Sequence, residues 1–355
     1  MSTGCIFVAM SGGVDSSVAA AILKAQGHDV RGITCMLFPG QTDSVSYAQA
    51  VARFLHIPHE VLDLTAPFAQ HVTEPFCHAY HTGFTPNPCI DCNRHIKFGA
   101  LWDYARMQGA ARLATGHYAR IVRTEAYQLL KAVDQAKDQS YFLYTLTQPQ
   151  LEAALFPLGE MTKAMVRQTA VSLGLTKFIR QEESQDICFI PNGNYASFVT
   201  GYLQARPGQI VDTDGRVLGK HCGLVGYTIG QRKGLGSLAE VPLYVVKLDA
   251  LRNQIVVGPK EALYRTELTA RDLCWISGQP PSCLAGITAR VRLKSPEAVT
   301  YIAVSPDTLQ VKFSTPQWAV TPGQSIVFYR GDEVLGGGII DDSLMHKTEM
   351  AELFP

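Results

Sequence analysis

The sequence contains no apolar run near the about 20 residues needed to cross a bilayer. Its N-terminus, MSTGCIFVAM, has neither a basic leader nor a long apolar segment, so we expect no signal peptide and no membrane contact. It also has no excess of charge, because 31 Lys and Arg balance 31 Asp and Glu. A net charge of zero gives the protein no overall positive field that would attract nucleic acid, but it does not exclude a local basic patch. We expect a cytoplasmic protein.

Cysteine is present, but the sequence gives no reason to expect structural disulfides. In the cytoplasm thiols stay reduced, so the nine cysteines are not a disulfide framework. Most are expected to be small core residues, with two or three carrying chemistry.

A chain of 355 residues is too long for a single typical hydrophobic core, so two or three domains are expected. Short apolar runs alternate with helical patterns over the first half of the chain, which predicts an α/β domain with a parallel sheet. Beyond about residue 205 the chain is rich in Val, Thr and Gly and predicts short strands, with a hairpin around Asp214-Gly215. The expected domains are 1–200, a central β-rich domain 201–267, and a C-terminal β-barrel 268–355.

The stretch SGGVDSS (11–17) lies between an apolar run and a helical pattern. A Gly turn that opens a helix presents backbone N–H groups and the positive end of the helix dipole to an anion. Gly12 and Gly13 allow a positive φ and close approach of a phosphate. Ser11, Ser16 and Ser17 add hydroxyl donors, and Asp15 could hold a metal on the phosphates. A simple Gly turn with side-chain capping remains open.

Two segments place cysteine in reactive surroundings. TPNPCIDCNRHIKF (85–98) puts Cys92 ahead of a helix with cations, which favours a lowered thiol pKa and a good nucleophile. Cys89 and Cys92 form a C-x-x-C pair, which favours a redox or metal role. Cys188 lies in an apolar, strand-like run, where a buried core thiol is the other interpretation.

SGGVDSS after a strand resembles the PP-loop of ATP pyrophosphatases, which cleave ATP between the α- and β-phosphates. Further stretches resemble the tRNA-specific 2-thiouridylases and follow that family's order along almost the whole chain. They are TPNPCIDCNRHIKF, ATGHYAR (114–120), KDQSYFLYTL (137–146), ICFI (187–190), ARPGQI (205–210), TIGQRKGLG (228–236), TPGQSIVFY (321–329) and LGGGII (335–340). The resemblance implies a PP-loop domain, a small central β domain, a C-terminal barrel, and thiolation of the wobble uridine of certain tRNAs.

The resemblance also implies roles for residues at matching positions. Cys92 matches the nucleophile, Cys188 matches the persulfide carrier, and the two could pass through a disulfide. The implied ATP site, with Mg²⁺, is Ala9, Met10, Ser11, Gly12, Gly13, Val14, Asp15, Ser16, Cys35 and Gly116. The region beside the target base is Asn87, Pro88 and Cys89, and the implied tRNA contacts are His117, Lys137, Asp138, Gln139, Arg292 and Gln324.

Two positions depart from the family pattern. Cys35 stands where members of the family commonly have Met. We expect little effect, because the contact of this residue with ATP would be largely through the main chain. Cys89 stands where many members have Asp, so Cys89, Cys92 and Cys188 together could hold a 4Fe–4S cluster with one open iron. A persulfide on Cys188, resolved by Cys92, is the competing mechanism and the one we favour slightly.

The sequence thus predicts a monomeric enzyme that binds a tRNA anticodon arm and a sulfur donor, either a cysteine desulfurase or a relay protein. The basic stretch 230–236 could order on tRNA or could be an exposed hairpin tip. Two other functions stay open: a PP-loop ligase or amidase acting on a small molecule, and a non-catalytic RNA-binding protein.

Overall fold

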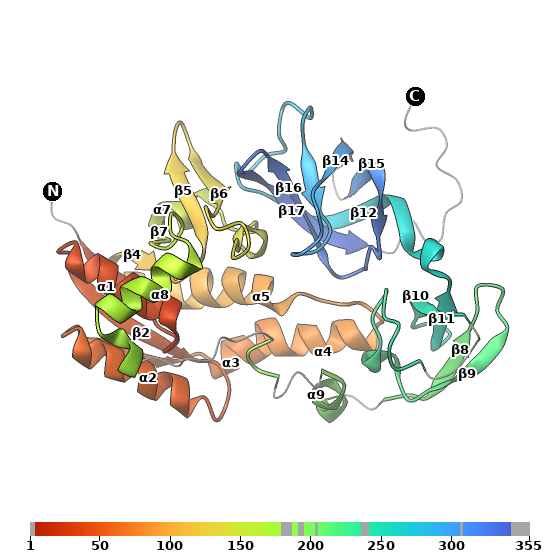
Figure 1. The fold of residues 1–355 in the computed structure, drawn as a ribbon, viewed down its shortest axis with the longest axis horizontal. Helices are drawn as coiled ribbons and strands as arrows, with labels where there is room; N and C mark the ends of the chain where they lie inside the picture. The colour runs from red at the N-terminus through yellow and green to blue at the C-terminus, as the bar shows by residue number, and fades with distance from the viewer. Residues whose placement is uncertain are drawn as a thin grey trace.

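The structure is a computed structural model that describes residues 4–178, 187–190, 195–202, 205–235, 241–305 and 308–341. The parallel sheet lies at one end of the molecule, with the barrel and the central β domain toward the other (Figure 1). Helices α4 (Glu74–His81) and α5 (Pro88–Asp91) lie across the middle of the molecule, and α5 is continued by η2 (Cys92–Leu101). No helix among the described residues is long and apolar enough to cross a membrane.

The N-terminal sheet is parallel throughout, as predicted, with strand order β3-β2-β1-β4-β7. Its strands are β1 (Cys5–Ala9), β2 (Val30–Met36), β3 (His59–Asp63), β4 (Ala110–Ala114) and β7 (Ala154–Leu155). The middle of β1 is buried because helices cover both sheet faces: Val8 packs with α1, while Phe7 packs in a core on the opposite face. The strand order reverses between β1 and β4, where open α/β sheets bind ligands.

Helices connect these strands. They are α1 (Val14–Ala25), α2 (Thr42–Phe54), α3 (Thr65–Phe68), η1 (Ala69–Thr73), α4 (Glu74–His81), α5 (Pro88–Asp91), η2 (Cys92–Leu101), α6 (Trp102–Met107), α7 (Gln148–Ala153), α8 (Lys163–Ser172) and α9 (Tyr195–Tyr202). Short 3₁₀ turns are η3 (Ser140–Phe142), η4 (Leu175–Lys177), η6 (Leu224–Gly226) and η7 (Lys260–Leu263). The helical segments 65–81 and 88–107 are each a chain of short α and π segments, and η2 is a π-helix interrupted at Gly99.

The second half of the chain forms two β units. The central sheet has the order β10-β11-β8-β9, with β8 (Gly208–Val211), β9 (Val217–His221), β10 (Tyr244–Asp249) and β11 (Gln254–Gly258). The hairpin predicted around Asp214-Gly215 is β8–β9. The C-terminal strands are β12 (Tyr264–Trp275), β13 (Thr288–Arg290), β14 (Ala298–Val304), β15 (Leu309–Trp318), β16 (Ser325–Arg330) and β17 (Glu333–Asp341). Pairing of β12 with both β15 and β17 closes them into the expected barrel.

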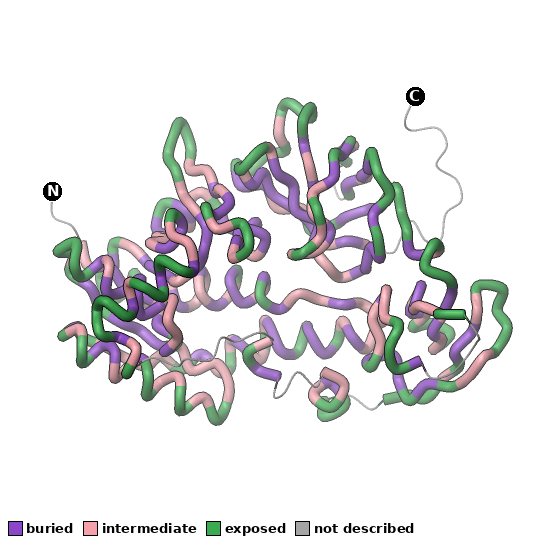
Figure 2. Tube along the Cα trace, viewed as in Figure 1, coloured by how far each residue is buried: buried purple, intermediate pink, exposed green. Residues whose placement is uncertain are grey.

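A hairpin from the N-terminal half joins the barrel, which the sequence did not indicate. Strands β5 (Ala119–Arg123) and β6 (Tyr127–Lys131) pair with each other, and β6 pairs with β17. One hydrophobic core includes Leu129 of the hairpin together with Val327 and Val334 of the barrel, and Figure 2 shows buried residues in both the hairpin and the barrel strands. The first and last parts of the chain are one packed body at this point.

Candidate active site

The stretch 11–17 folds as a tight loop that opens α1. Gly12 has φ of 75°, and a Cβ there would lie 2.6 Å from the Ser44 carbonyl oxygen, so the position requires glycine. Gly13 is extended, with φ of −87°. The Ser11 N–H donates to Ser16 Oγ at 3.1 Å, which holds the loop closed. Ser17 is fully buried and donates to the Gly13 carbonyl, so the expectation that it offers a free hydroxyl is wrong.

This loop and the end of β4 enclose a cavity of about 260 Å³ at the topological switch point. The loop after β4 approaches so closely that a Cβ on Gly116 would lie 2.8 Å from the Ser16 nitrogen. Most of the predicted nucleotide positions line the cavity: Ala9, Met10, Ser11, Asp15, Ser16, Cys35 and Gly116. Gln41 donates to the Cys35 carbonyl at 3.1 Å, so this carbonyl already has a protein partner, and the main-chain contact of Cys35 with ATP stays a prediction.

The Asp15 carboxylate is engaged by protein groups. Lys163 Nζ lies 2.8 Å from both carboxylate oxygens, and Tyr118 donates its hydroxyl to Oδ1 at 2.7 Å. The Lys163 side chain is only 10% exposed, whereas that of Asp15 is 34% exposed. Lys163 thus neutralises a carboxylate that lines this cavity, and no sequence pattern around Thr162-Lys163 indicated that role.

Replacing Lys163 with methionine should weaken ATP binding about 10-fold, or about 1.4 kcal/mol. The change leaves Asp15 as an uncompensated negative charge beside the phosphates. Lys163→Arg, which keeps the charge, is the matched control and should retain most of the affinity. The measurement is the dissociation constant of ATP. An unchanged constant in Lys163→Met would show that Lys163 does not contribute to ATP binding and only forms the first turn of α8.

A second, larger cavity of about 820 Å³ lies between the three parts of the chain. Its lining includes the predicted target-base segment Asn87, Pro88 and Cys89, and also Gln139 and Gln324. The continuous helical segment 88–101 starts at this cavity, and its residues Ile96, Lys97 and Leu101 line the smaller one. Gln139 lines both. Cys92 therefore lies on the one helical segment that joins the two cavities.

The thiols of the site are protonated at neutral pH in this structure. Cys92 is 8% exposed, and burial raises its pKa to about 11 although the charge of Lys97 lowers it. The predicted lowering is therefore wrong, because loss of hydration disfavours the thiolate more than one cation favours it. Burial likewise raises the pKa values of Cys89 and Cys188 to about 11, although both retain exposed surface.

Cys89, Cys92 and Cys188 are neighbours and all are free thiols. A charge on Cys188 would raise the pKa of Cys92, and one on Cys89 would raise that of Cys188. Cys188 lies in a turn closed by the Ile190 N–H and the Ile187 carbonyl, not in the expected strand. Among the described residues, which include all three cysteines, no group of three or more His, Cys, Asp or Glu side chains could hold a metal ion. That finding concerns a single ion, whereas the three thiols would each bind a different iron of a 4Fe–4S cluster, so the cluster at Cys89, Cys92 and Cys188 stays a prediction.

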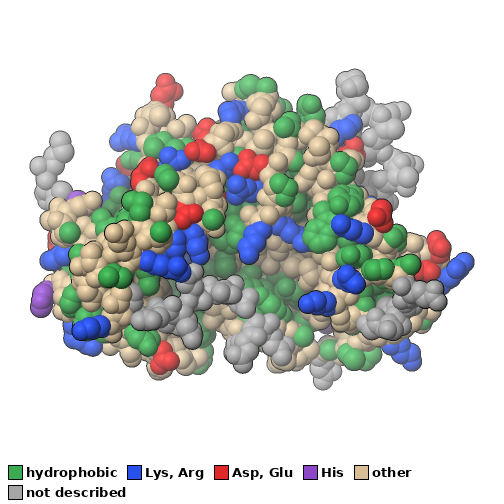
Figure 3. Space-filling model, in the orientation of Figure 1, with side chains coloured by type: hydrophobic (Ala, Val, Ile, Leu, Met, Phe, Trp, Pro, Cys, Tyr) green, Lys and Arg blue, Asp and Glu red, His purple; other side chains and the backbone are tan. Residues whose placement is uncertain are grey.

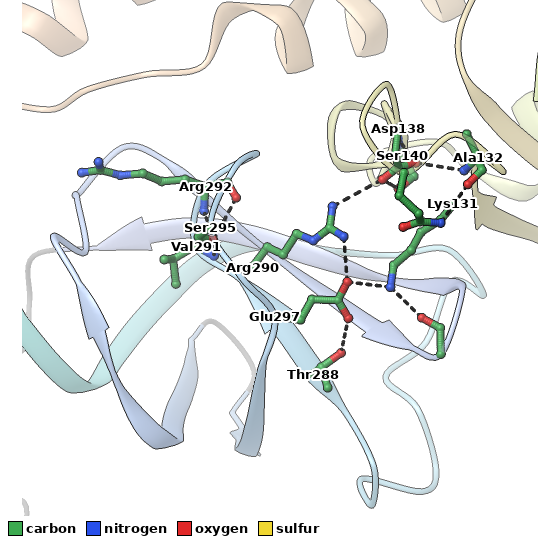
Figure 4. Close-up of polar contacts among 12 residues, drawn as sticks. Lys131, Ala132, Asp138, Ser140, Thr288, Arg290, Val291, Arg292, Ser295 and Glu297 are labelled. Atoms are coloured by element: carbon green, nitrogen blue, oxygen red, sulfur yellow. Dashed lines mark hydrogen bonds and ion pairs between the residues drawn. The ribbon is translucent and has the colours of Figure 1, made fainter. Parts of the chain in front are cut away.

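The predicted tRNA contacts occupy different environments. His117 is 7% exposed and lines the nucleotide cavity. The Asp138 side chain is 1% exposed and binds Arg290, Ser140 and the Ala132 N–H, so it has almost no surface to offer RNA (Figure 4). Lys137 is half-buried.

Arg292 and Gln324, the two predicted tRNA contacts in the C-terminal part of the chain, connect domains. Arg292 donates to the carbonyls of Ile229 and Ala319 and to Thr321, and so joins the central domain to the barrel. Gln324 donates to the Thr85 carbonyl at 2.8 Å and thereby holds the segment that leads to Asn87.

Sequence reasoning missed further groups at the site. Tyr118 and Lys163 reach Asp15 from elements far along the chain. Asp91, beside Cys92, has its pKa raised by burial to about 6, with Arg94 opposing the rise. The sequence shows Lys97 as a cation five residues after Cys92, but only the fold shows that it lines the smaller cavity.

Comparison with known proteins agrees with this arrangement. Residues 4–192 match the family described as tRNA methyl transferase HUP domain, 196–259 the tRNA methyl transferase PRC-barrel domain, and 265–340 the Aminomethyltransferase beta-barrel domain. The tRNA-specific 2-thiouridylase MnmA of Trichormus variabilis is 47% identical over 95% of this chain and 98% of that protein. This chain belongs to the tRNA-specific 2-thiouridylase family. The MnmA of Roseiflexus castenholzii is 46% identical over 94% of this chain and 98% of its own.

Proteins with this HUP domain bind ATP, and the assignment of the 260 Å³ cavity to ATP stays a prediction. Among solved structures, the U34-tRNA thiolase NcsA from Methanococcus maripaludis with its [4Fe-4S] cluster matches with a TM-score of 0.37 and 19% identity, covering 56% of this chain and 63% of that one. A likeness this weak says nothing about a cluster in the 2-thiouridylase described here.

Proposed function

We propose that this protein is an ATP-dependent enzyme that replaces the 2-oxygen of the wobble uridine of tRNA with sulfur. One observation carries the proposal: the helical segment 88–101 lines the 260 Å³ cavity at one end and the 820 Å³ cavity at the other, with Cys92 between them. The curated relatives that align along almost the whole chain are named for 2-thiouridylation of tRNA. A ligase for small molecules would not need the larger cavity, which is bounded by three domains.

The first step proposed is adenylation of the uracil. ATP lies on the loop 11–16 with its α-phosphate toward Gly116 and Gln139, and the target base enters past Asn87 and Cys89. The uracil 2-oxygen forms a bond to the α-phosphorus, and pyrophosphate leaves with the bridging oxygen. Mg²⁺ accompanies the phosphates and neutralises their charge. Because Asp15 is paired with Lys163, it would reach that ion only through a rearranged pair.

The second step proposed is sulfur transfer. Cys188 is exposed, so a donor protein can load it with a persulfide. The terminal sulfur bonds to C2 of the uracil, and AMP leaves. Cys92 then attacks the Cys188 sulfur, and its thiol proton passes through water to the departing sulfur of the 2-thiouridine, which leaves a Cys92–Cys188 disulfide. An external thiol reduces that disulfide before the next turnover.

The tRNA is proposed to lie in the hollow that the larger cavity opens into. Lys and Arg side chains flank this hollow, while its floor is largely apolar (Figure 3). A chain with zero net charge thus still presents cations where an anticodon arm would enter. Arg232 and Lys233 of the predicted basic loop are exposed, and this loop is described up to residue 235. Gln139 and Gln324 line this cavity, and they and the nearby Lys137 are proposed to contact the RNA from the N-terminal domain and the barrel.

The test is nucleoside analysis of tRNA after incubation with ATP and a persulfide donor. Formation of 2-thiouridine at the wobble position, dependent on ATP, is the expected result. Pyrophosphate release with a small molecule but not with tRNA would instead indicate a ligase. Binding of tRNA with no release of pyrophosphate under any condition would indicate a non-catalytic RNA-binding protein.

A cluster-dependent mechanism makes a different prediction at Cys89. If Cys188 carries the sulfur as a persulfide, protein purified without oxygen should contain no iron, and Cys89→Ala should keep at least about half of the wild-type activity. Iron and acid-labile sulfide assays beside the activity assay check this. About four irons per chain in the wild type, lost in Cys89→Ala, would overturn the persulfide mechanism.

A further inference from the structure

We infer that Lys97 is a catalytic residue, whose ammonium group stabilises the α-phosphate as the target uridine is adenylated. The inference rests on the proposed function. Lys97 lines the ATP cavity together with Ser11, Ser16 and Gly116, the groups that surround the phosphate position. In a π-helix hydrogen bonds close over five residues, so Lys97 lies on the same face as Cys92, five positions earlier. The side chain thus lies where the nucleotide and the thiol chemistry meet.

A neutral partner holds the ammonium group in place. Lys97 Nζ lies 3.4 Å from His117 Nε2, and His117 Nδ1 lies 2.7 Å from Thr115 Oγ1. Burial, helped by the charge of Lys97, lowers the pKa of His117 well below its ordinary value, so the ring is neutral. Lys97 therefore donates to Nε2, and the proton on Nδ1 is donated to Thr115. The imidazole orients Lys97 without neutralising it.

The positive charge of Lys97 remains available to a substrate. Within the described part of the chain no carboxylate forms an ion pair with it, in contrast to Lys163 and Asp15. The same charge acts on the surrounding thiols: burial raises the pKa values of Cys35, Cys89, Cys92 and Cys188, and Lys97 lowers each of them. One cation thus faces both the phosphate and the sulfur groups.

The chemistry needs a donor at this position. As the uracil 2-oxygen bonds to the α-phosphorus, negative charge grows on the non-bridging oxygens while the bond to the β-phosphate oxygen breaks. The N3 proton of the uracil is lost to water. Lys97 stays protonated throughout and donates a hydrogen bond to a non-bridging oxygen, an interaction that strengthens as the charge develops.

The experiment measures pyrophosphate release in a single turnover with saturating ATP and tRNA. Lys97→Met should slow release at least about 100-fold, the usual loss for a preorganised donor, while the dissociation constant of ATP changes less than about 5-fold. Lys97→Arg should recover at least a tenth of the wild-type rate. Arg94→Met is the matched control: it removes an exposed cation from the same helical segment, outside the residues lining either cavity.

A second readout separates this role from a structural one. Alkylation of Cys92, followed on its peptide at fixed pH, should slow about 3- to 10-fold in Lys97→Met and stay unchanged in Arg94→Met, because thiolate reactivity depends on nearby charge. A Lys97→Met rate within 3-fold of wild type would overturn the inference. So would a loss of ATP affinity as large as the loss of rate. If the wild type itself makes no 2-thiouridine, the proposed function fails instead.

Discussion

Cys92→Ser is expected to abolish 2-thiouridine formation, with a loss of at least about 1,000-fold. Serine preserves the size of the side chain in a buried position, but its hydroxyl cannot attack a persulfide or form the disulfide with Cys188. ATP binding should be unaffected, because Cys92 is not among the residues that line the ATP cavity. Adenylation should also continue, so pyrophosphate release on tRNA persists when sulfur transfer is blocked.

Cys222→Ser is the matched control for this prediction. Cys222 is an exposed thiol of the central domain and lines neither cavity, so its loss should leave the rate within about 2-fold of wild type. The measurement is 2-thiouridine per tRNA against time for both variants. More than a tenth of the wild-type rate in Cys92→Ser would show that Cys92 is not the nucleophile.

Glu297→Gln is expected to destabilise the barrel by about 3 kcal/mol. The Glu297 carboxylate lies 2.6 Å from Lys131 Nζ and 2.8 Å from Arg290, and it also accepts from Thr288 (Figure 4). The Lys131 and Arg290 side chains are only 7% and 14% exposed. Removal of the charge leaves two largely buried cations with Asp138 as the remaining anion of the network.

The exposed pair Glu267–Lys312 provides a control in the same barrel. Its atoms are 3.9 Å apart and both side chains are about half exposed, so Glu267→Gln should cost less than about 0.5 kcal/mol. Urea unfolding followed by tryptophan fluorescence reports on this region, because Trp275 and Trp318 are in barrel strands. Equal midpoints for Glu297→Gln and wild type would contradict the prediction.

The Glu297 effect should depend on pH in a defined direction. Burial alone would raise the pKa of Glu297, but hydrogen bonds from Lys131 and Thr288 outweigh it and lower the pKa below the ordinary 4.5. A carboxylate with a lowered native pKa stabilises the fold above its unfolded-state pKa and loses this contribution as pH falls through the native value. The stability difference between wild type and Glu297→Gln should therefore be full at pH 7 and shrink below about pH 4.5.

Much of the architecture could be predicted because it depends on local patterns. The apolar run before SGGVDSS and the helix after it determine a strand, turn and helix wherever they occur, and alternating residues such as those of β14 determine a half-buried strand. The domain boundaries proposed near residues 200 and 268 stay predictions. The hairpin β5–β6 escaped prediction because its partner β17 lies about 200 residues away, and strand pairing at that distance leaves no local signal.

By itself, then, the sequence determined the kinds of elements, the glycine turn that opens α1, and the family. The tertiary structure alone decided what surrounds each group. It paired Asp15 with Lys163, buried Asp138 against Arg290, and raised the pKa of Cys92 where neighbouring cations had suggested the opposite. The reason is physical: the charge state of a side chain depends on its hydration and on charges within a few ångströms, and both are set by segments far apart in the chain.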